Sequence, residues 1–224
     1  MNFRLIIATL GLVLSGLGWP SPGLAATITD QLGRSVTVPD APQRIVALAP
    51  SITEIVYALG CEDRLVGVTR FSDHPPRAKQ LPQVGSYVQL NIEKIAALEP
   101  DLCIAVKDGN PLNVIRRMEA LNIPVYAVDP RNFAAISEMV TEIGGLLDAL
   151  AAADRINAEM AARIEGVRRR VSAAGERPTV FFQIGVSPIV AAGTNPFIHE
   201  LIEVAGGRNA TAGPVPYPRI SQEQ

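Results

Sequence analysis

Four short apolar runs, each separated from the next by a helical pattern, constrain the fold more than any other feature. The runs are RIVALAP at 44–50, RLVGVT at 64–69, DLCIAV at 101–106 and IPVYAV at 123–128. Their apolar residues are largely consecutive, which is typical of strands buried on both faces of a parallel sheet. Helical patterns lie between them, over 51–60, 91–99 and 111–122. This alternation predicts an α/β lobe with a parallel sheet.

Local signals predict where several elements begin and end. Residues 27–38, TITDQLGRSVTV, alternate around a Leu-Gly pair and predict a short hairpin ahead of the first strand. Ser51 and Glu54 have the spacing of a capping box, and Gly60 is the expected C-terminal stop of the same helix.

A long stretch after the fourth strand carries no strand signal. It is rich in Ala, Glu, Met, Leu and Arg, and it predicts one helix over 132–147 and a longer one over 151–173. Strand-like runs return at 178–185 and 188–193, followed by a helix at 195–204. We therefore expect α/β architecture with two Rossmann-like lobes joined by a long rigid helix. The expected segments are a signal peptide, 1–25, a first lobe, 26–131, a helical connector, 132–173, and a second lobe, 174–224.

The first residues have the pattern of a secretion signal. Arg4 precedes an apolar run that ends near Trp19, and small residues stand at the two positions that a signal peptidase reads before Ala25. We expect cleavage near Ala25 and a periplasmic mature protein, with an uncleaved signal anchor as the alternative.

Composition and motifs argue against several function classes. The formal net charge of −2 gives no basic footprint for nucleic acid. No nucleophile elbow, phosphate-binding loop or zinc-binding His-Glu-x-x-His motif occurs. His74 and His199 are too few to predict a dedicated metal site. Cys61 and Cys103 are expected to be buried free thiols rather than a disulfide. We predict no catalytic residue, no metal site and no cofactor.

One short sequence pattern occurs in both lobes. The spacing of Tyr87, Asn91 and Glu93 recurs around Tyr217 and places Glu223 in the same position. Each copy of the pattern has a loop aromatic residue, a helix-capping residue and a glutamate in the first helical turn, where the helix dipole favours a carboxylate. After Glu93 the chain continues with a helix and a buried strand, whereas one residue follows Glu223. We therefore expect the second lobe to be incomplete and the sequence to be part of a longer protein.

Aromatic residues are expected to line the cleft between the lobes. Phe71 and Tyr87 lie in loops of the first lobe, on the side where α/β folds bind ligands, and Tyr217 has the equivalent place in the second lobe. Flat rings on both sides of a cleft suit a large, flat, partly apolar ligand. Lys107, in the loop after the third strand, is placed to reach polar substituents of such a ligand or to be solvated.

Several longer sequence segments resemble those of a known family. RIVALAPSITEIVYALG, LVGVTRFSDHPP, VGSYVQLNIEKIAALEPDL and GNP resemble the periplasmic substrate-binding proteins of ABC importers for cobalamin, ferric siderophores and haem. The resemblance extends over 44–224 and is strongest to the cobalamin binders. It implies two lobes with modest closure around the ligand, and docking onto permease arginines through Glu93 and Glu223.

The resemblance also implies roles for individual cleft residues. Aromatic positions of the cobalamin binders are matched by Phe71, Tyr87 and Tyr217. Two positions depart, because a family tryptophan is Val106 here and a family phenylalanine is Ile184, which reduces the stacking area. The candidate ligand-binding residues are Ser51, Phe71, Tyr87, Lys107, Ile184 and Tyr217.

These observations predict a monomeric extracytoplasmic binding protein that delivers a corrinoid to an ABC permease and is not an enzyme. In the same transport role, a ferric siderophore would favour a basic cleft formed by Arg70, Lys107 and Arg219. Haem would favour axial ligation by Tyr87 or His74. Two other classes stay open: an exported enzyme with a Rossmann-like fold, and a sensor that presents ligand to a receptor.

Overall fold

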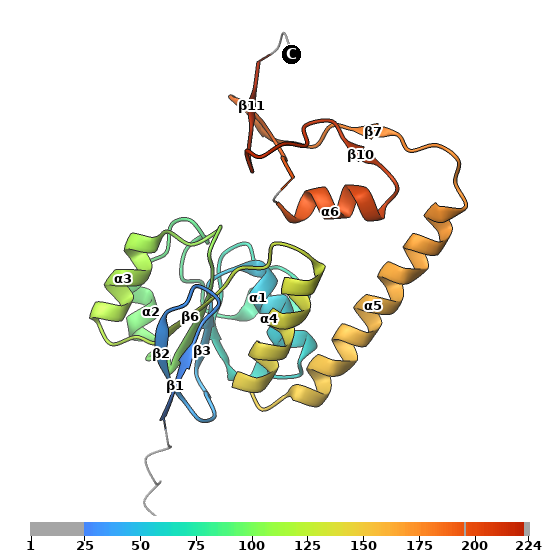
Figure 1. Ribbon diagram of the computed structural model, residues 1–224. Helices are drawn as coiled ribbons and strands as arrows, with labels where there is room; N and C mark the ends of the chain where they lie inside the picture. Colours follow the sequence, from blue (N-terminus) through green and yellow to red (C-terminus); the bar gives the residue numbers. More distant parts are fainter. Residues whose placement is uncertain (1–24, 195, 222–224) are drawn as a thin grey trace, which may run out of the picture.

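The structure is a computed structural model that describes residues 25–194 and 196–221. It has two lobes joined by one long helix, and the first lobe is built on a four-stranded sheet (Figure 1). All strand pairs in this sheet are parallel, in the order β4-β3-β5-β6. The strands are β3 (Ile45–Ala47), β4 (Leu65–Gly67), β5 (Leu102–Val106) and β6 (Val125–Val128). The predicted parallel α/β sheet is confirmed.

Helices cover both faces of this sheet, because successive strand residues point to opposite sides. On β5, Leu102 and Ile104 belong to one core cluster, and Cys103 and Ala105 belong to the other. Helices α1 and α4 pack on the first cluster, and α2 and α3 pack on the second. Cys103 and Cys61 are buried free thiols, as predicted. The helices are α1 (Pro50–Ala58), α2 (Ile92–Ala97), α3 (Leu112–Ala120) and α4 (Phe133–Leu146).

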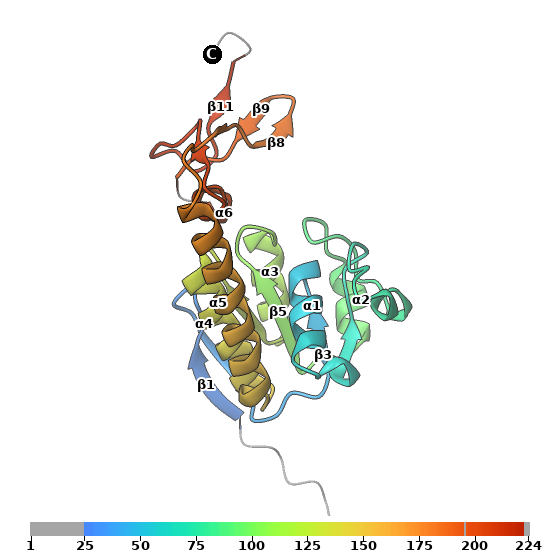
Figure 2. The ribbon, with the colours of Figure 1, turned by 90° about the vertical axis from the view of Figure 1, so that its right-hand side faces the viewer.

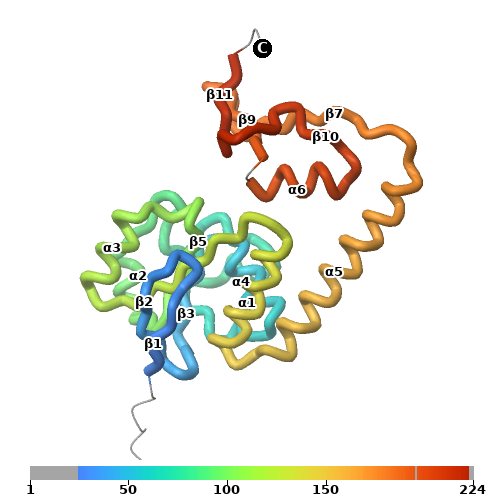
Figure 3. Tube along the Cα trace, in the orientation of Figure 1, coloured from blue at the N-terminus to red at the C-terminus, as the bar shows by residue number. Residues whose placement is uncertain are grey.

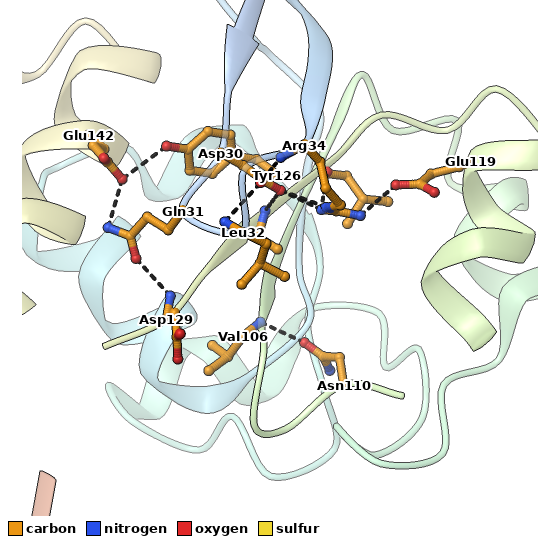
Figure 4. A network of polar contacts seen from close by, with 12 residues as sticks. Asp30, Gln31, Leu32, Arg34, Val106, Asn110, Glu119, Tyr126, Asp129 and Glu142 are labelled. Carbon is orange, nitrogen blue, oxygen red and sulfur yellow. Dashed lines mark hydrogen bonds and ion pairs between the residues drawn. The ribbon is translucent and has the colours of Figure 1, made fainter. Parts of the chain in front are cut away.

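A hairpin packs beside the sheet, as predicted. Its strands are β1 (Ala25–Thr29) and β2 (Ser35–Pro39). The turn is held by Asp30, whose fully buried carboxylate accepts hydrogen bonds from the backbone N–H of Leu32 at 2.9 Å and from the Arg34 guanidinium at 2.6 Å (Figure 4). Arg34 also bonds to Glu119 at 2.5 Å and to the Val125 carbonyl at 3.1 Å. These bonds fix the hairpin to α3 and β6.

The long helix α5 (Leu150–Ser172) joins the lobes. Its 23 residues span roughly 35 Å at the usual helical rise. The first turns pack on α4, where a Cβ atom on Gly144 would lie 2.7 Å from the Ala153 Cβ, so the glycine permits the close approach. Asn157 adds a hydrogen bond of 3.0 Å to the Ser137 carbonyl. The rest of α5 leaves the first lobe and runs to the second (Figure 2). The predicted bridging helix is confirmed.

The second lobe contains short strands of mixed direction and one helix. β7 pairs with β10 in parallel, and β9 lies between β8 and β11 with both pairings antiparallel. Arg177 donates to Glu203 at 2.7 Å and to the Gly207 carbonyl at 2.8 Å. These bonds fix the C-terminal end of the second lobe's helix to the residues just before β7. The elements are β7 (Thr179–Val180), β8 (Gln183–Val186), β9 (Ile189–Ala191), α6 (Phe197–Val204), β10 (Arg208–Asn209) and β11 (Arg219–Ile220).

One predicted helix start is wrong. The residue that caps α1 is Ala49, its side chain makes no capping bond, and Pro50 is the first helical residue. Proline fits this position because its φ is already helical and it has no N–H to satisfy. Ser51 therefore lies inside the first turn and forms no capping box with Glu54. The Gly60 stop is confirmed, with φ at +75°.

Two further predictions fall on the chain ends. The expected signal residues 1–24 lie outside the described residues, and Ala25 is the first residue of β1. Ser221 follows β11, and Glu223 and Gln224 lie outside the described residues. Among the described helices, none is long and apolar enough to cross a membrane.

Candidate functional site

The carboxyl ends of the parallel strands carry the loops that face the second lobe. On this edge the rings of Phe71 and Tyr87 lie with their centroids 6.2 Å apart at 60°. The Arg70 guanidinium lies 4.9 Å from the centre of the Phe71 ring, within the range of a cation–π contact. Phe71 is 49% exposed and Tyr87 is 39% exposed, so a large part of each ring is available for contact. We call Phe71 and Tyr87 the aromatic pair.

Buried polar contacts hold the two loops of the aromatic pair. The Thr53 hydroxyl donates to the Ser72 hydroxyl at 2.9 Å, and Ser72 lies 3.0 Å from the Thr69 hydroxyl. This chain of hydroxyls ties the Phe71 loop to α1. Gly85 opens the Tyr87 loop with φ at +109°, and a Cβ there would lie 2.3 Å from the Gln89 carbonyl oxygen. Only glycine fits this turn.

A cavity of about 330 Å³ lies where the two lobes meet. Residues that follow β5 and β6 form its first-lobe wall, and residues before and within α6 and ahead of β11 form its second-lobe wall. The lining residues are Val106, Asp108, Asp129, Pro130, Arg131, Pro196, Phe197, Pro216 and Tyr217. A Cβ on Gly109, the residue after Asp108, would lie 3.4 Å from the Tyr87 ring, so Tyr87 lies close to the loop that forms part of the cavity wall. We call this space the interlobe cavity.

The charged groups of the interlobe cavity are paired with one another. Asp129 accepts from the Lys107 ammonium at 2.9 Å and from the Arg131 guanidinium at 2.8 Å. The Tyr217 hydroxyl donates to Asp108 across the cavity at 3.3 Å. Burial and the neighbouring Asp108 carboxylate raise the pKa of the Tyr217 phenol above its ordinary value.

A second interlobe contact lies beside the cavity. The rings of Phe133 on α4 and Phe197 on α6 meet edge to face, with centroids 5.2 Å apart. The Glu200 carboxylate accepts a hydrogen bond of 2.6 Å from the backbone N–H of Phe133, the first residue of α4. Figure 3 shows α6 lying over α4 in this region. We call these three residues the α4–α6 contact.

A larger, more apolar cavity of about 750 Å³ continues on the other side of Phe197. It runs between α1 and α4 and shares Phe197 and Pro130 with the interlobe cavity. Ser51 and His74 line it, together with the apolar side chains of Ile55, Ile136 and Met139. Ser51 and Tyr217 therefore line two different cavities.

The structure brings some of the predicted site residues together and not others. Tyr217 lines the interlobe cavity, and Tyr87 of the aromatic pair lies close to the loop that forms part of its wall. Lys107 pairs with Asp129 but lines a different groove of about 430 Å³ beside α3. Ile184 is exposed on β8 and lines none of the cavities named above.

The structure describes one of the two predicted docking glutamates. Glu93 is exposed in the first turn of α2, where Asn91 caps the helix as expected, by accepting from the Lys94 N–H at 2.8 Å. Glu223 lies outside the described residues. No group of three His, Cys, Asp or Glu side chains that could hold a metal ion occurs within 25–194 and 196–221.

Several residues of the interlobe cavity were missed from the sequence. Asp129 and Arg131 follow β6 directly, at the same sheet edge as Lys107, so the rule that selected Lys107 could have found them. Phe197 and Glu200 carry no such signal, because a phenylalanine and a glutamate on an amphipathic helix look like core and solvent-facing residues.

An α/β lobe on each side of a cavity, with a single rigid helix between them, defines a class of proteins that hold a small ligand between lobes. The family model described as periplasmic binding protein matches residues 45–224. A vitamin B12-binding protein from Yersinia pestis is 32% identical over 208 residues, which are 92% of this chain and 73% of that relative. The chain belongs to the periplasmic binding protein family.

Solved structures with this fold bind more than one kind of ligand. The periplasmic vitamin B12 binding protein of Vibrio cholerae is similar with a TM-score of 0.72 and 31% identity, over 81% of this chain and 71% of that one. A periplasmic heme binding protein from Pseudomonas aeruginosa is similar with a TM-score of 0.76 and 31% identity, over 81% of this chain and 67% of that one. Family membership is thus compatible with either ligand class.

Proposed function

We propose that the protein binds a corrinoid between its two lobes outside the cytoplasm and delivers it to a membrane ABC importer. In this role it acts as a monomer and performs no chemistry. The observation that carries the proposal is the presence of partly exposed aromatic rings on both lobes: Tyr217, which lines the interlobe cavity, is 45% exposed, and the aromatic pair lies close to the loop that contributes Asp108 to the same cavity. Exposed ring faces offer contact area to a flat, partly apolar ligand. The similarity of the chain to vitamin B12-binding proteins supports the choice.

The charge arrangement favours a corrinoid over an anionic siderophore. Arg131, on the wall of the interlobe cavity, and Lys107, which lines the neighbouring groove, both pair with Asp129, so the two cations are already neutralised in part. An anionic ligand would compete with Asp129 for them. The peripheral amides of a corrinoid, by contrast, can hydrogen-bond to paired charges and to the Tyr217 hydroxyl without displacing a full charge.

Haem is the second candidate, and the similar heme binding protein is the observation that favours it. Its iron would need an axial ligand. Tyr87, a member of the aromatic pair, and His74, on the wall of the larger apolar cavity, are the candidates on the first lobe.

Direct titration distinguishes these ligands. The purified chain is titrated with cyanocobalamin, haemin and ferrichrome, and binding is followed by calorimetry and tyrosine fluorescence. We expect submicromolar affinity, roughly −8 kcal/mol or stronger, for cyanocobalamin alone. Binding of haemin or ferrichrome without cyanocobalamin would overturn the corrinoid and keep the transport role.

Matched tyrosine variants identify how the rings contribute. Tyr87→Ala and Tyr217→Ala are each expected to weaken cyanocobalamin binding about tenfold, equivalent to about 1.4 kcal/mol. Tyr87→Phe and Tyr217→Phe keep the ring and should retain most of the affinity. If a tyrosine phenolate instead ligates haem iron, the corresponding Phe variant should lose haemin binding, because it lacks the oxygen atom that ligates the iron.

Docking onto the permease is assigned to Glu93 and Glu223. Glu93 is exposed at a helix start, where it is free of the ligand cavity. A charge at a rim steers association rather than ligand binding. In a reconstituted transporter, Glu93→Gln should reduce ligand-stimulated ATP hydrolysis with unchanged ligand affinity. The exposed Glu138 on α4 provides the matched control, and equal effects of Glu93→Gln and Glu138→Gln would contradict the assignment.

A further inference from the structure

A single asparagine, in the loop that contributes Asp108 to the interlobe cavity, joins three backbone segments. Asn110 lies in the loop between β5 and α3 and is 7% exposed. Its Oδ1 accepts from the Val106 N–H at 2.7 Å, a contact that Figure 4 shows. Its Nδ2 donates to the Leu48 carbonyl at 2.8 Å and to the Tyr87 carbonyl at 2.8 Å. Both amide hydrogens and the amide oxygen are thus used.

These bonds connect the sheet to the aromatic pair. Leu48 follows β3 and Val106 ends β5, two strands that pair side by side. Tyr87 is 23 residues from Asn110 along the chain and belongs to a different loop. The Asn110 amide therefore anchors the main chain of Tyr87 to the rigid carboxyl edge of the sheet.

The same loop also supports the Tyr87 ring. A Cβ on Gly109 would lie 3.4 Å from Tyr87 Cδ2, so the ring lies close to the loop that carries Asn110. The ring also neighbours Phe71, with centroids 6.2 Å apart, and the Phe71 loop is tied to the Tyr87 loop by the Arg70 N–H to Gly85 carbonyl bond of 2.8 Å. The ring is held between two anchored loops although it is more than one-third exposed.

We propose that Asn110 is a positioning residue that orients Tyr87 for ligand binding. This inference rests on the proposed function, because it assigns Tyr87 a contact with the ligand. A ring held in its bound orientation loses little conformational entropy when the ligand arrives, and that saving appears as affinity. Asparagine suits the position because aspartate has no amide donors and would turn a second oxygen toward two carbonyl oxygens.

The variant Asn110→Asp tests the inference with nearly unchanged size. Cyanocobalamin and haemin serve as probes. For whichever one binds, we expect the dissociation constant to rise about tenfold in Asn110→Asp and less than twofold for the same change in a Tyr87→Ala background. Asn113→Asp is the matched control, because Asn113 is an exposed asparagine on α3. The affinity of this variant for the probe should equal that of the parent. An equal loss in both backgrounds would overturn the inference.

A readout at Tyr87 itself separates this inference from the proposed function. Fluorotyrosine is placed at position 87, and its fluorine NMR signal is compared in the parent, Asn110→Asp and Asn113→Asp chains without ligand. We expect a sharper signal, shifted toward the free amino acid, in Asn110→Asp alone. An unchanged signal would overturn the positioning role even if every probe failed to bind. Should Asn110→Asp not fold, Asn110→Ala removes the same donors without adding charge and is read in the same way.

Discussion

The α4–α6 contact gives a prediction that can be tested at one amide. Glu200, on the second lobe, accepts from the N–H of the first residue of α4 at 2.6 Å. A carboxylate in this position supplies both a capping hydrogen bond and a favourable interaction with the helix dipole, together about 1–2 kcal/mol for a partly exposed group. Glu200→Ala removes both. Glu200→Gln keeps an acceptor oxygen and loses the charge, about 0.3–1 kcal/mol.

Native-state hydrogen exchange of the Phe133 amide measures this energy directly. A loss of 1–2 kcal/mol corresponds to exchange about 5–30 times faster in Glu200→Ala. Glu200→Gln should fall between this variant and the parent. The edge-to-face contact of Phe133 and Phe197 stays in place and is worth about 0.5–1.5 kcal/mol, so the lobes remain in contact.

The control uses a second glutamate on the same helix. Glu203 pairs with Arg177 at 2.7 Å within the second lobe and does not reach α4. Glu203→Ala should therefore leave the Phe133 amide unchanged. Equal Phe133 exchange in the parent and Glu200→Ala would refute the reasoning, because it would show that the carboxylate does not protect this amide.

Two further predictions concern the first lobe. Asp30→Ala leaves the Arg34 guanidinium and three backbone N–H groups without their buried carboxylate, so the free energy of unfolding in urea should fall by about 3–5 kcal/mol; a loss below about 1 kcal/mol would contradict this account. Burial and the hydrogen bond to Glu142 raise the pKa of the Tyr126 phenol. The folded protein therefore keeps a proton that the unfolded chain releases near pH 10, so the free energy of unfolding should decline above about pH 10. Tyr126→Phe should make that decline less steep, and an identical pH profile would count against it.

Much of the fold was predictable because the chain repeats one strong pattern. Apolar runs such as 101–106 are short, consecutive and bounded by turn residues, which leaves few alternatives to buried parallel strands. The helix from 151 to 173 was predictable from its composition alone. The start of α1 was not, because the Ser51–Glu54 spacing competes with Pro50, and the fixed φ of proline prevailed.

The candidate site was predictable only where it follows the edge of the sheet. Phe71 and Tyr87 lie in loops after or beside strand ends, a place defined by topology. The pairing of Tyr217 with Asp108 and of Phe133 with Phe197 depends on how the second lobe is oriented. That orientation depends on the direction in which α5 leaves the first lobe, which no local pattern encodes. Ligand identity is still harder to predict, since the chain resembles binders of two ligand classes at 31% identity.

The two interlobe contacts differ in strength, and the difference bears on how a ligand enters. The α4–α6 contact combines a charged hydrogen bond of 2.6 Å with an aromatic contact, and it lies beside the cavity. Tyr217 and Asp108 meet inside the cavity through one longer hydrogen bond of 3.3 Å. A ligand with a hydrogen-bond acceptor can take the Tyr217 hydroxyl from Asp108 in exchange, at little net cost. On the proposed function, ligand entry therefore requires only the weaker contact to open, while the α4–α6 contact and α5 hold the two lobes together.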